Sequence, residues 1–309
     1  MNTTLTSVPG IQVGHAESAD RATGCTVVLG PFRAAAEVRG LATGSREMGP
    51  LDPDHLVPRV DGILLTGGSA FGLAAADGVM EWLAERGRGY DTGVARVPIV
   101  PAAVIFDLAP ERPRPGSPMG RLACDHATAE PLAEGRVGAG TGATVGKFLG
   151  RQNGMPGGVG SWALDIGEYR VGGLAVVNAL GDVLDAEGSI VAGARADGGF
   201  VDSARAVRSA LGRGEMGGAK AGTNTTLAVV ATDAPLSRVD LARLARTAGN
   251  ALARRIAPVH TPFDGDVIFA ASTAEEIRDV TSAEVLSLGA AAQAALEEAI
   301  TRAVTEGTR

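Results

Sequence analysis

The sequence predicts a mixed α/β fold in which layers of β-sheet are covered by helices. Short apolar runs of the kind that form buried strands alternate along the chain with amphipathic segments of helical period. Glycine accounts for 44 of the 309 residues, roughly twice its usual share, which indicates many tight turns and close backbone approaches. The order of the strands within the sheets cannot be read from these patterns.

Four strands and one helix are predicted in the chain before residue 190. The strands are predicted by the apolar runs at residues 25–29, 62–66, 97–106 and 172–180. A helix is predicted over residues 70–85, with Ser69 as a candidate N-cap. Its apolar residues recur at helical spacing and are Phe71, Ala75, Val79 and Trp82.

Three segments are less regular. Residues 109–120 are rich in proline and residues 150–161 are rich in glycine, so both are expected to be surface loops. Residues 191–223 combine a short helical stretch at 201–211 with glycine-rich flanks.

The pattern is clearest after residue 225, where it predicts strand, helix, strand and helix in turn. The strands are residues 225–232 and 266–273, and the first helix is expected to begin at about Ser237. The last helix is expected to open with Thr281 and Glu284, which have the spacing of a capping box.

Composition and charge exclude several classes of function. A formal charge of −7, a pI near 5.2 and only 4% aromatic residues argue against a nucleic-acid surface. The N-terminus lacks the pattern of a signal peptide, and no run of 18 apolar residues occurs, so we expect a cytoplasmic protein without a membrane partner. Cys25 and Cys124 lie far apart in unrelated contexts, which does not indicate a disulfide scaffold, and Cys25 is expected to be buried.

Glycine-rich segments and acidic residues suggest cofactor or metal sites, but their spacing is wrong. The segment TGGSAFG at 66–72 is neither a dinucleotide fingerprint nor a P-loop, and GAGTGATVGK at 138–147 lacks the acidic residue that should follow it. The DGD motif at 264–266 begins like a calcium loop, but Ile268 and Phe269 occupy positions that need an oxygen ligand and a glycine. We therefore expect neither a metal nor an organic cofactor.

Asn224-Thr225 and the Asp264/Asp266 pair could together carry catalysis. A threonine hydroxyl is a weak nucleophile unless a base lies beside it, and an N-terminal threonine has its own α-amine as that base. Cleavage before Thr225 would create this terminus, and two carboxylates on one face of an extended segment could orient the hydroxyl and the amine. The alternative from the residues alone is a capped strand start and an exposed D-G-D turn.

Five longer blocks resemble one enzyme family. They are GILLTGGSAFGLAAADGV, PAAVIFDL, GRVGAGTGATVGK, GTNTTLAVVATDAPL and IAPVHTPFDGDVIFAAST, in this order along residues 8–305. The sequence resembles the self-cleaving DmpA-type aminopeptidases, a family that includes L-aminopeptidase/D-esterases, β-peptidyl aminopeptidases and nylon-oligomer hydrolases. The resemblance implies a four-layer αββα sandwich and one domain over residues 1–309. It also implies self-cleavage between Asn224 and Thr225 into chains 1–224 and 225–309.

The resemblance also implies roles for individual residues. Thr225 would be the nucleophile that forms an acyl-enzyme, with Asp264 and Asp266 as its acidic partners in the threonine-nucleophile branch of the family. Asn178 would donate a hydrogen bond to the developing oxyanion, and Lys147 would support that charge or tune the Thr225 amine. The matching blocks place five residues at the substrate pocket, namely Gly68, Ser69, Phe71, Phe106 and Gly140. Phe106 departs from those relatives that carry a tyrosine there and cannot supply a hydroxyl.

The expected activity is hydrolysis of amide bonds in small peptides or linear oligoamides, by a homotetramer of cleaved protomers. Whether the enzyme acts as an aminopeptidase or cleaves oligoamides internally is left open by the sequence. Two alternatives use the same fold: an acyltransferase that passes the acyl group from threonine to an amine, and a non-catalytic binding protein.

Overall fold

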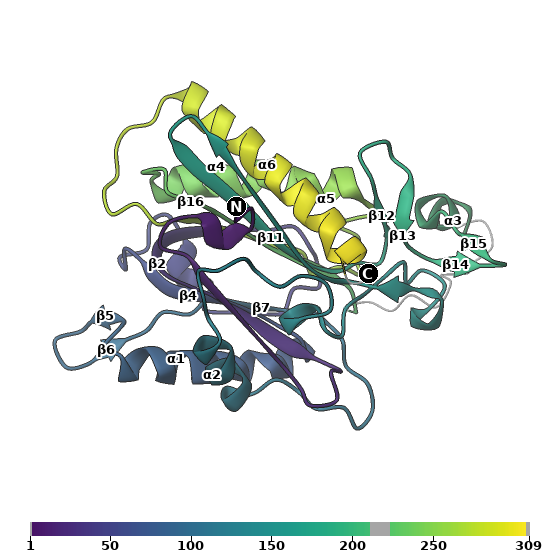
Figure 1. The fold of residues 1–309 in the computed structure, drawn as a ribbon, viewed down its shortest axis with the longest axis horizontal. Helices are drawn as coiled ribbons and strands as arrows, with labels where there is room; N and C mark the ends of the chain where they lie inside the picture. Colours follow the sequence, from purple (N-terminus) through teal and green to yellow (C-terminus); the bar gives the residue numbers. More distant parts are fainter. Residues whose placement is uncertain (1, 211–222, 307–309) are drawn as a thin grey trace.

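Two sheets that share one long strand form the centre of the molecule. The structure is a computed structural model and describes residues 2–210 and 223–306 (Figure 1). Strand β2 (Gly24–Val38) pairs with β18 through residues 33–38 and with β4 through residues 25–32, and the pairing shifts register between Leu29 and Phe32. The sheets are therefore joined by hydrogen bonds in the order β10-β11-β16-β18-β2-β4-β7-β3, with β1 also paired to β2.

Each sheet has its own set of strands besides β2. The first sheet contains β10 (Gly158–Ile166), β11 (Tyr169–Asn178), β16 (Thr225–Thr232) and β18 (Val267–Ser272). The second contains β1 (Gln12–Glu17), β3 (Ser45–Arg46), β4 (Val60–Thr66) and β7 (Ala102–Val104). Only β16 with β18 and β4 with β7 pair in parallel among the pairs of these strands.

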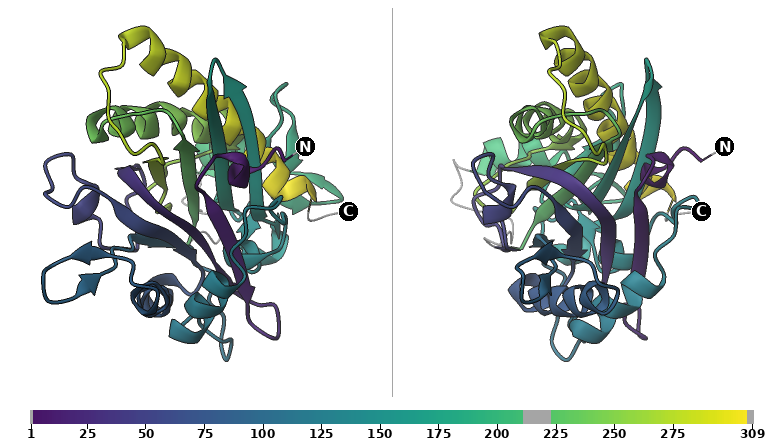
Figure 2. Two further views of the ribbon diagram at one scale, coloured as in Figure 1. Left: turned by 60° about the vertical axis from the view of Figure 1, so that its left-hand side comes forward. Right: turned by 90° about the vertical axis from the view of Figure 1, so that its left-hand side faces the viewer.

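Helices cover the outer face of each sheet. Helices α4 (Arg238–Ala248), α5 (Asn250–Arg255) and α6 (Ser282–Thr305) lie on the first sheet. Helices α1 (Ala75–Glu85) and α2 (Ser117–Asp125) lie on the second. Figures 1 and 2 show the two helical groups on opposite sides of the strands. The result is a helix-sheet-sheet-helix arrangement, so the expected four-layer sandwich is confirmed.

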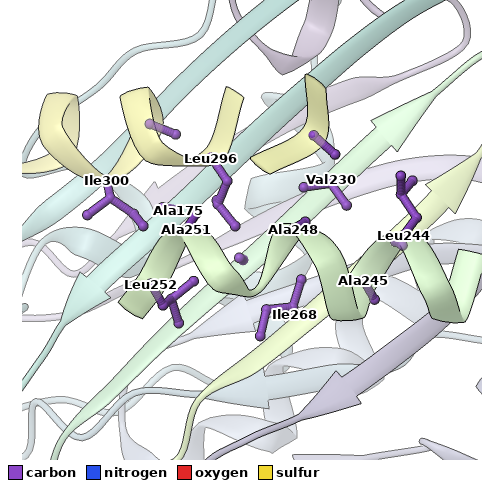
Figure 3. Close-up of a cluster of buried hydrophobic side chains, with 14 of the residues drawn as sticks. Ala175, Val230, Leu244, Ala245, Ala248, Ala251, Leu252, Ile268, Leu296 and Ile300 are labelled. Atoms are coloured by element: carbon purple, nitrogen blue, oxygen red, sulfur yellow. The ribbon is translucent and has the colours of Figure 1, made fainter. Parts of the chain in front are cut away.

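Three hydrophobic cores separate the four layers, and alternation along the strands explains why. In β16, Leu227 and Val229 face the core between the sheets, whereas Ala228 and Val230 face α4 to α6. Figure 3 shows the core under α4 to α6, to which Leu296 and Ile300 of α6 and Val230 of β16 all belong. Because both faces of these strands are buried, they read in the sequence as continuous apolar runs.

Shorter elements complete the described chain. Helix α3 spans Ser203–Ala210, and the end of the predicted helical stretch at residue 211, with the glycine-rich segment to 222, lies outside the described residues. The short strands are β5 (Tyr90–Asp91), β6 (Arg96–Val97), β8 (Thr144–Val145), β9 (Met155–Pro156), β12 (Asp182–Leu184), β13 (Ile190–Ala192), β14 (Arg195–Ala196), β15 (Gly199–Phe200) and β17 (Ile256–Ala257). The 3-10 turns are η1 (Leu5–Ser7), η2 (Gly49–Leu51), η3 (Ser69–Ala74), η4 (Gly138–Gly140) and η5 (Arg151–Asn153).

The elements after residue 225 form where the sequence predicts them. Strand β16 has the predicted bounds, and Ser237 caps α4 by accepting a hydrogen bond from the Asp240 N–H. Thr281 and Glu284 form both hydrogen bonds of the capping box at the start of α6. Cys25 is fully buried, as expected.

Four local predictions were wrong or incomplete. Ser69 does not cap a helix: it has φ 51° and begins a 3-10 turn, and the regular helix α1 starts only at Ala75. The predicted strand 97–106 is reduced to the three residues of β7, flanked by the end of β6, because prolines at 98 and 101 lack the N–H that a strand ladder needs.

Two segments predicted to be loops contain regular structure. In 109–120, α2 begins at Ser117, and Pro118 suits the first turn of a helix, where its missing N–H costs nothing. In 150–161, β10 begins at Gly158, and its glycines permit close packing on α6. A Cβ on Gly160 would lie 2.0 Å from the Ala299 carbonyl oxygen.

Within residues 2–210 and 223–306, no helix is long and apolar enough to cross a membrane.

Candidate active site

The ends of three neighbouring strands bring the predicted site residues together. Asn178 is the last residue of β11 and lies directly opposite Thr225, the first residue of β16. One residue earlier, Asn224 forms a parallel bridge with Asp264, in the loop that leads into β18. Thr225 lies on the same strand face as Leu227, and Asn178 lies on the same face as Val176, so both face the space between the sheets.

The Asn224-Thr225 peptide bond is buried at the centre of this site. The Thr225 side chain, in a residue only 4% exposed, donates a hydrogen bond to the Asn224 carbonyl oxygen. The Gly265 N–H donates to the same oxygen at 2.9 Å. The Asn224 amide donates to the Phe263 carbonyl oxygen at 3.3 Å. The hydroxyl of Thr225 therefore lies against the peptide bond that precedes it, and a backbone N–H already polarises that carbonyl.

Asp264 and Asp266 are both buried, so they do not form an exposed turn. Asp264 Oδ2 accepts hydrogen bonds from the Thr261 N–H at 3.0 Å and from the Thr261 hydroxyl. Asp266 Oδ1 accepts from the Thr226 N–H at 2.6 Å. Burial, together with the negative charge of Asp266, raises the pKa of Asp264 above its ordinary range.

The two carboxylates form no hydrogen bond with the Thr225 hydroxyl among the described residues, although the sequence suggested that they would orient it. The hydroxyl contacts Asn224 instead. Asp266 acts one residue away, on the backbone of Thr226. Asp266 thus fixes the backbone next to Thr225, whereas Asp264 holds its own loop through the Thr261 N–H and also accepts the Leu180 N–H, just after β11, at 3.4 Å.

Lys147 is buried and its ammonium group is surrounded by acceptors. Its Nζ donates to the Asn178 carbonyl oxygen and to Asn178 Oδ1, each at 2.9 Å, and to the Thr223 carbonyl oxygen at 3.2 Å. Burial lowers the pKa of Lys147 to about 7, and the negative charge of Asp264 opposes this shift. Because Asn178 Oδ1 also accepts from the Thr144 N–H, the Asn178 amide nitrogen is directed towards Thr223 and Phe106.

The residues predicted for the substrate pocket lie in different surroundings. The Phe106 carbonyl oxygen accepts from the Asn178 amide at 3.3 Å, and the Gly68 N–H donates to Asp107 Oδ1 at 2.7 Å. Phe71 is exposed, and a guanidinium lies 3.8 Å from its ring centroid. Gly140 is buried against β10, since a Cβ there would lie 2.5 Å from Gly158. In the described chain, no hydrogen bond joins Gly68, Ser69, Phe71 or Gly140 to Thr225 or the two aspartates.

Three contributors to the site were not found from the sequence: the Gly265 N–H, His260 and Thr261. Thr261 has a recognisable signal, because a threonine three residues before an aspartate is typical of a tight capped turn. The role of Gly265 depends on a contact with a distant loop. A Cβ on Gly265 would lie 3.0 Å from Thr225 Oγ1 and 2.7 Å from the Ala42 carbonyl oxygen.

In the described parts of the chain, no three His, Cys, Asp or Glu side chains are grouped as metal ligands.

Comparisons with known proteins agree with this architecture. The model of peptidase family S58 matches residues 3–309. An uncharacterized aminopeptidase of Mycobacterium leprae is 40% identical over 87% of this chain and 78% of its own length. A 6-aminohexanoate-oligomer endohydrolase of Kocuria sp. is 31% identical over 96% of this chain and 84% of its own length.

Two solved structures show the same fold at low sequence identity. The Burkholderia sp. β-aminopeptidase has a TM-score of 0.71 at 21% identity, over 98% of this chain and 86% of its own. The L-aminopeptidase D-Ala-esterase/amidase of Ochrobactrum anthropi, a variant of the Ntn hydrolase fold, has a TM-score of 0.70 at 20% identity, over 97% and 85%. Together with the family match, these likenesses show that the chain belongs to peptidase family S58, has an Ntn hydrolase fold and is a hydrolase of amide bonds.

Proposed function

We propose that the chain cleaves itself between Asn224 and Thr225 and that Thr225 then serves as an N-terminal nucleophile. The substrates would be amides in small peptides or linear oligoamides. The observation that supports this most is the contact of the Thr225 hydroxyl with the preceding peptide bond, whose oxygen also accepts the Gly265 N–H at 2.9 Å. A nucleophile and an oxyanion donor are thus placed on one carbonyl group.

The self-cleavage step follows from this placement. Thr225 Oγ1 attacks the Asn224 carbonyl carbon, and the carbonyl oxygen takes up negative charge next to the Gly265 N–H. The C–N bond then breaks, and the nitrogen of Thr225 takes up the proton that the hydroxyl has lost. Water hydrolyses the resulting ester, which leaves a carboxylate on Asn224 and a free α-amine on Thr225.

Hydrolysis of a substrate then uses the new terminus. The α-amine, with an ordinary pKa of about 7.7–8.0, accepts the hydroxyl proton while Thr225 Oγ1 attacks the substrate carbonyl. The substrate amine leaves with a proton, and water releases the acyl group from the ester. Lys147 contributes positive charge near Thr225 when protonated, which favours the neutral, basic form of the amine. The Asn178 amide, held by Lys147, would donate to the substrate oxygen once Thr223 has moved away.

Contacts between the two segments support a product in which the cleaved chains stay together. Strand β11, before the cleavage point, pairs with β16, after it, over eight residue positions. The buried Arg33 guanidinium also bonds four carbonyl oxygens of the later segment, those of Leu236 at 3.0 Å, Glu275 at 3.0 Å, Ala274 at 2.7 Å and Glu276 at 2.6 Å. The peptide bond to Thr225 is therefore one connection among many.

The nucleophile assignment is tested by two substitutions at one position. Thr225→Ala removes the hydroxyl and should abolish both chain cleavage and amide hydrolysis, whereas Thr225→Ser keeps a hydroxyl and should retain both. Cleavage is measured by mass spectrometry, and hydrolysis with aminoacyl anilides and with 6-aminohexanoate oligomers. Turnover of either substrate class by Thr225→Ala would refute the assignment.

The substrate panel also separates the possible activities. Release of single N-terminal residues would indicate an aminopeptidase, the activity named for the Mycobacterium leprae relative. Internal cleavage of the oligomers would indicate the activity named for the Kocuria relative. Adding ornithine or glutamate as acceptor distinguishes acyl transfer from hydrolysis, because transfer would give an acylated amine as product.

A further inference from the structure

His260 connects the loop of the two aspartates to the start of β16. Its Nδ1 lies 2.8 Å from Asp266 Oδ2, and Oδ1 of the same carboxylate accepts the Thr226 N–H at 2.6 Å. Because a carboxylate only accepts hydrogen bonds, Nδ1 carries the hydrogen. A chain of two hydrogen bonds therefore runs from His260 through Asp266 to the amide that follows Thr225.

His260 has a left-handed backbone conformation, and one of its two ring nitrogens is buried without a hydrogen-bond partner among the described residues. The residue has φ 52°, in the left-handed region, which few residues other than glycine adopt and which asparagine, aspartate and histidine tolerate best among them. Its Nε2 is buried and has no hydrogen-bond partner among the described residues. The ring is thus held by its bond to Asp266.

The two carboxylates next to Thr225 differ in their partners. Asp266 is held by an imidazole N–H and by a backbone N–H of the strand itself. Asp264 is bonded mainly to Thr261, and its pKa is raised by burial and by the negative charge of Asp266. The two carboxylates therefore hold different segments, Asp266 the start of β16 and Asp264 its own loop.

Other charged groups reach this pair from neighbouring segments. Lys147 interacts electrostatically with Asp264, and Asp107 and Arg151 in turn act on Lys147. Arg39 donates its backbone N–H to the Asp266 carbonyl oxygen at 3.0 Å, but its guanidinium is directed to the Arg246 carbonyl oxygen. The Thr225 α-amine is added after cleavage. In the described chain, His260 supplies the side-chain donor to Asp266.

We propose that His260 is a positioning residue for Thr225: by donating to Asp266, it holds that carboxylate in place and so fixes the amide that follows the nucleophile. The proposal rests on the proposed function of Thr225. It assigns different tasks to the two carboxylates, because Asp266 links His260 to the backbone of β16 and Asp264 holds its own loop through Thr261.

Substitutions at residue 260 can separate the hydrogen bond from the backbone conformation. His260→Gly permits φ 52° but removes the donor. His260→Asn also tolerates the left-handed region, and its Nδ2 stands where the imidazole Nδ1 stood, so it keeps the donor. His260→Gln places its amide one bond farther away and should behave like the glycine variant. His55→Gly, at an exposed histidine outside the site, is the matched control.

The readout is the rate of self-cleavage of freshly synthesised full chain as a function of pH, followed by the appearance of the two fragments. His260→Gly and His260→Gln should cleave about tenfold more slowly at neutral pH, a typical effect of losing a hydrogen bond to a charged group. The acid limb of their pH profiles should move to higher pH, because a carboxylate that loses a hydrogen-bond donor stays protonated up to a higher pH. His260→Asn should cleave at the rate of the unsubstituted chain and show the same acid limb. Added imidazole should partly recover the cleavage rate of His260→Gly.

Three results would overturn the proposal: an unchanged rate in His260→Gly, a slower rate without a shift of the acid limb, or failure of His260→Asn to recover the limb. The second result would mean that His260 only supports the fold. None of these results bears on Thr225, which is tested separately by cleavage in Thr225→Ala.

Discussion

The tetrapeptide Asn-Thr-Thr-Leu occurs twice in the chain, and the two copies show what a residue's surroundings decide. In the first copy, at residues 2–5, the Asn2 side chain accepts from the Thr4 N–H and from the Thr4 hydroxyl, which closes a local turn before η1. In the second copy, Asn224 and Thr225 begin a buried strand whose neighbours come from distant parts of the chain. The same letters thus make a turn in one place and a candidate cleavage site in the other.

The buried charge on Asp264 predicts a pH-dependent stability. Between the ordinary and the raised pKa of Asp264, the folded chain binds more protons than the unfolded chain, so its stability falls as the pH rises through that window. Asp264→Asn removes this titration. In a Thr225→Ala background, the melting temperature of Asp264→Asn minus that of its parent should increase from about pH 4 to about pH 8. A difference that stayed constant or decreased would mean that Asp264 does not titrate as proposed.

Gly265 should be required for self-cleavage because no side chain fits there. A Cβ would lie 2.7 Å from the Ala42 carbonyl oxygen and 3.0 Å from Thr225 Oγ1, so the loop carrying the Gly265 N–H would have to move. Gly265→Ala should slow cleavage by about 100-fold, the lower end of the usual cost of losing an oxyanion donor. Gly49→Ala is the control, since no atom lies within 4 Å of a Cβ built at that residue. Cleavage of Gly265→Ala at the normal rate would show that this N–H is dispensable.

At the scale of elements, local signals predicted the second half of the chain better than the first. The bounds of β16, the Ser237 cap and the Thr281–Glu284 capping box depend on residues close in sequence, and they were predicted correctly. The start of α2 within a proline-rich segment was missed because proline favours both a loop and a first helical turn.

The arrangement of the candidate site could be predicted only in part, because it depends on contacts between residues that are far apart in the sequence. The motifs named Thr225, Asp264 and Asp266 as candidates, and their catalytic roles stay predictions. Their geometry depends on strand order: Asn178 lies opposite Thr225 only because β11 and β16 are neighbours. The Gly265 and His260 contacts depend on loops that only the folded chain brings together, so residue patterns did not reveal them.

The capping box of α6 makes a prediction at this scale. Thr281→Ala removes the side-chain acceptor for the Glu284 N–H and should lower the free energy of unfolding by about 1 kcal/mol. Ser287→Ala, at an exposed position within the same helix, should change it by less than about 0.5 kcal/mol. Both are measured by denaturant unfolding in the Thr225→Ala background, so that one chain unfolds. Equal effects of the two substitutions would show that the cap does not stabilise α6.

At the scale of the whole molecule, the segments before and after the proposed cut are joined by many contacts besides the peptide bond. The candidate cleavage point lies where β16 enters the first sheet, with β11 on one side and β18 on the other. The core under α4 to α6 contains residues from both sides of the cut, among them Ala175 and Val177 before it and Val230 and Leu296 after it. The proposed fragments would therefore share one hydrophobic core and separate only on denaturation.

The most direct test of self-cleavage is the intact mass of freshly purified protein under denaturing conditions, with N-terminal sequencing of any fragment. Dividing the 31.1 kDa of the chain between residues 1–224 and 225–309 in proportion to length predicts fragments of about 22.5 and about 8.6 kDa. The smaller fragment should begin Thr-Thr-Leu-Ala. A single 31.1 kDa species that persisted after long incubation would contradict the account, because Thr225 would then have no free amine.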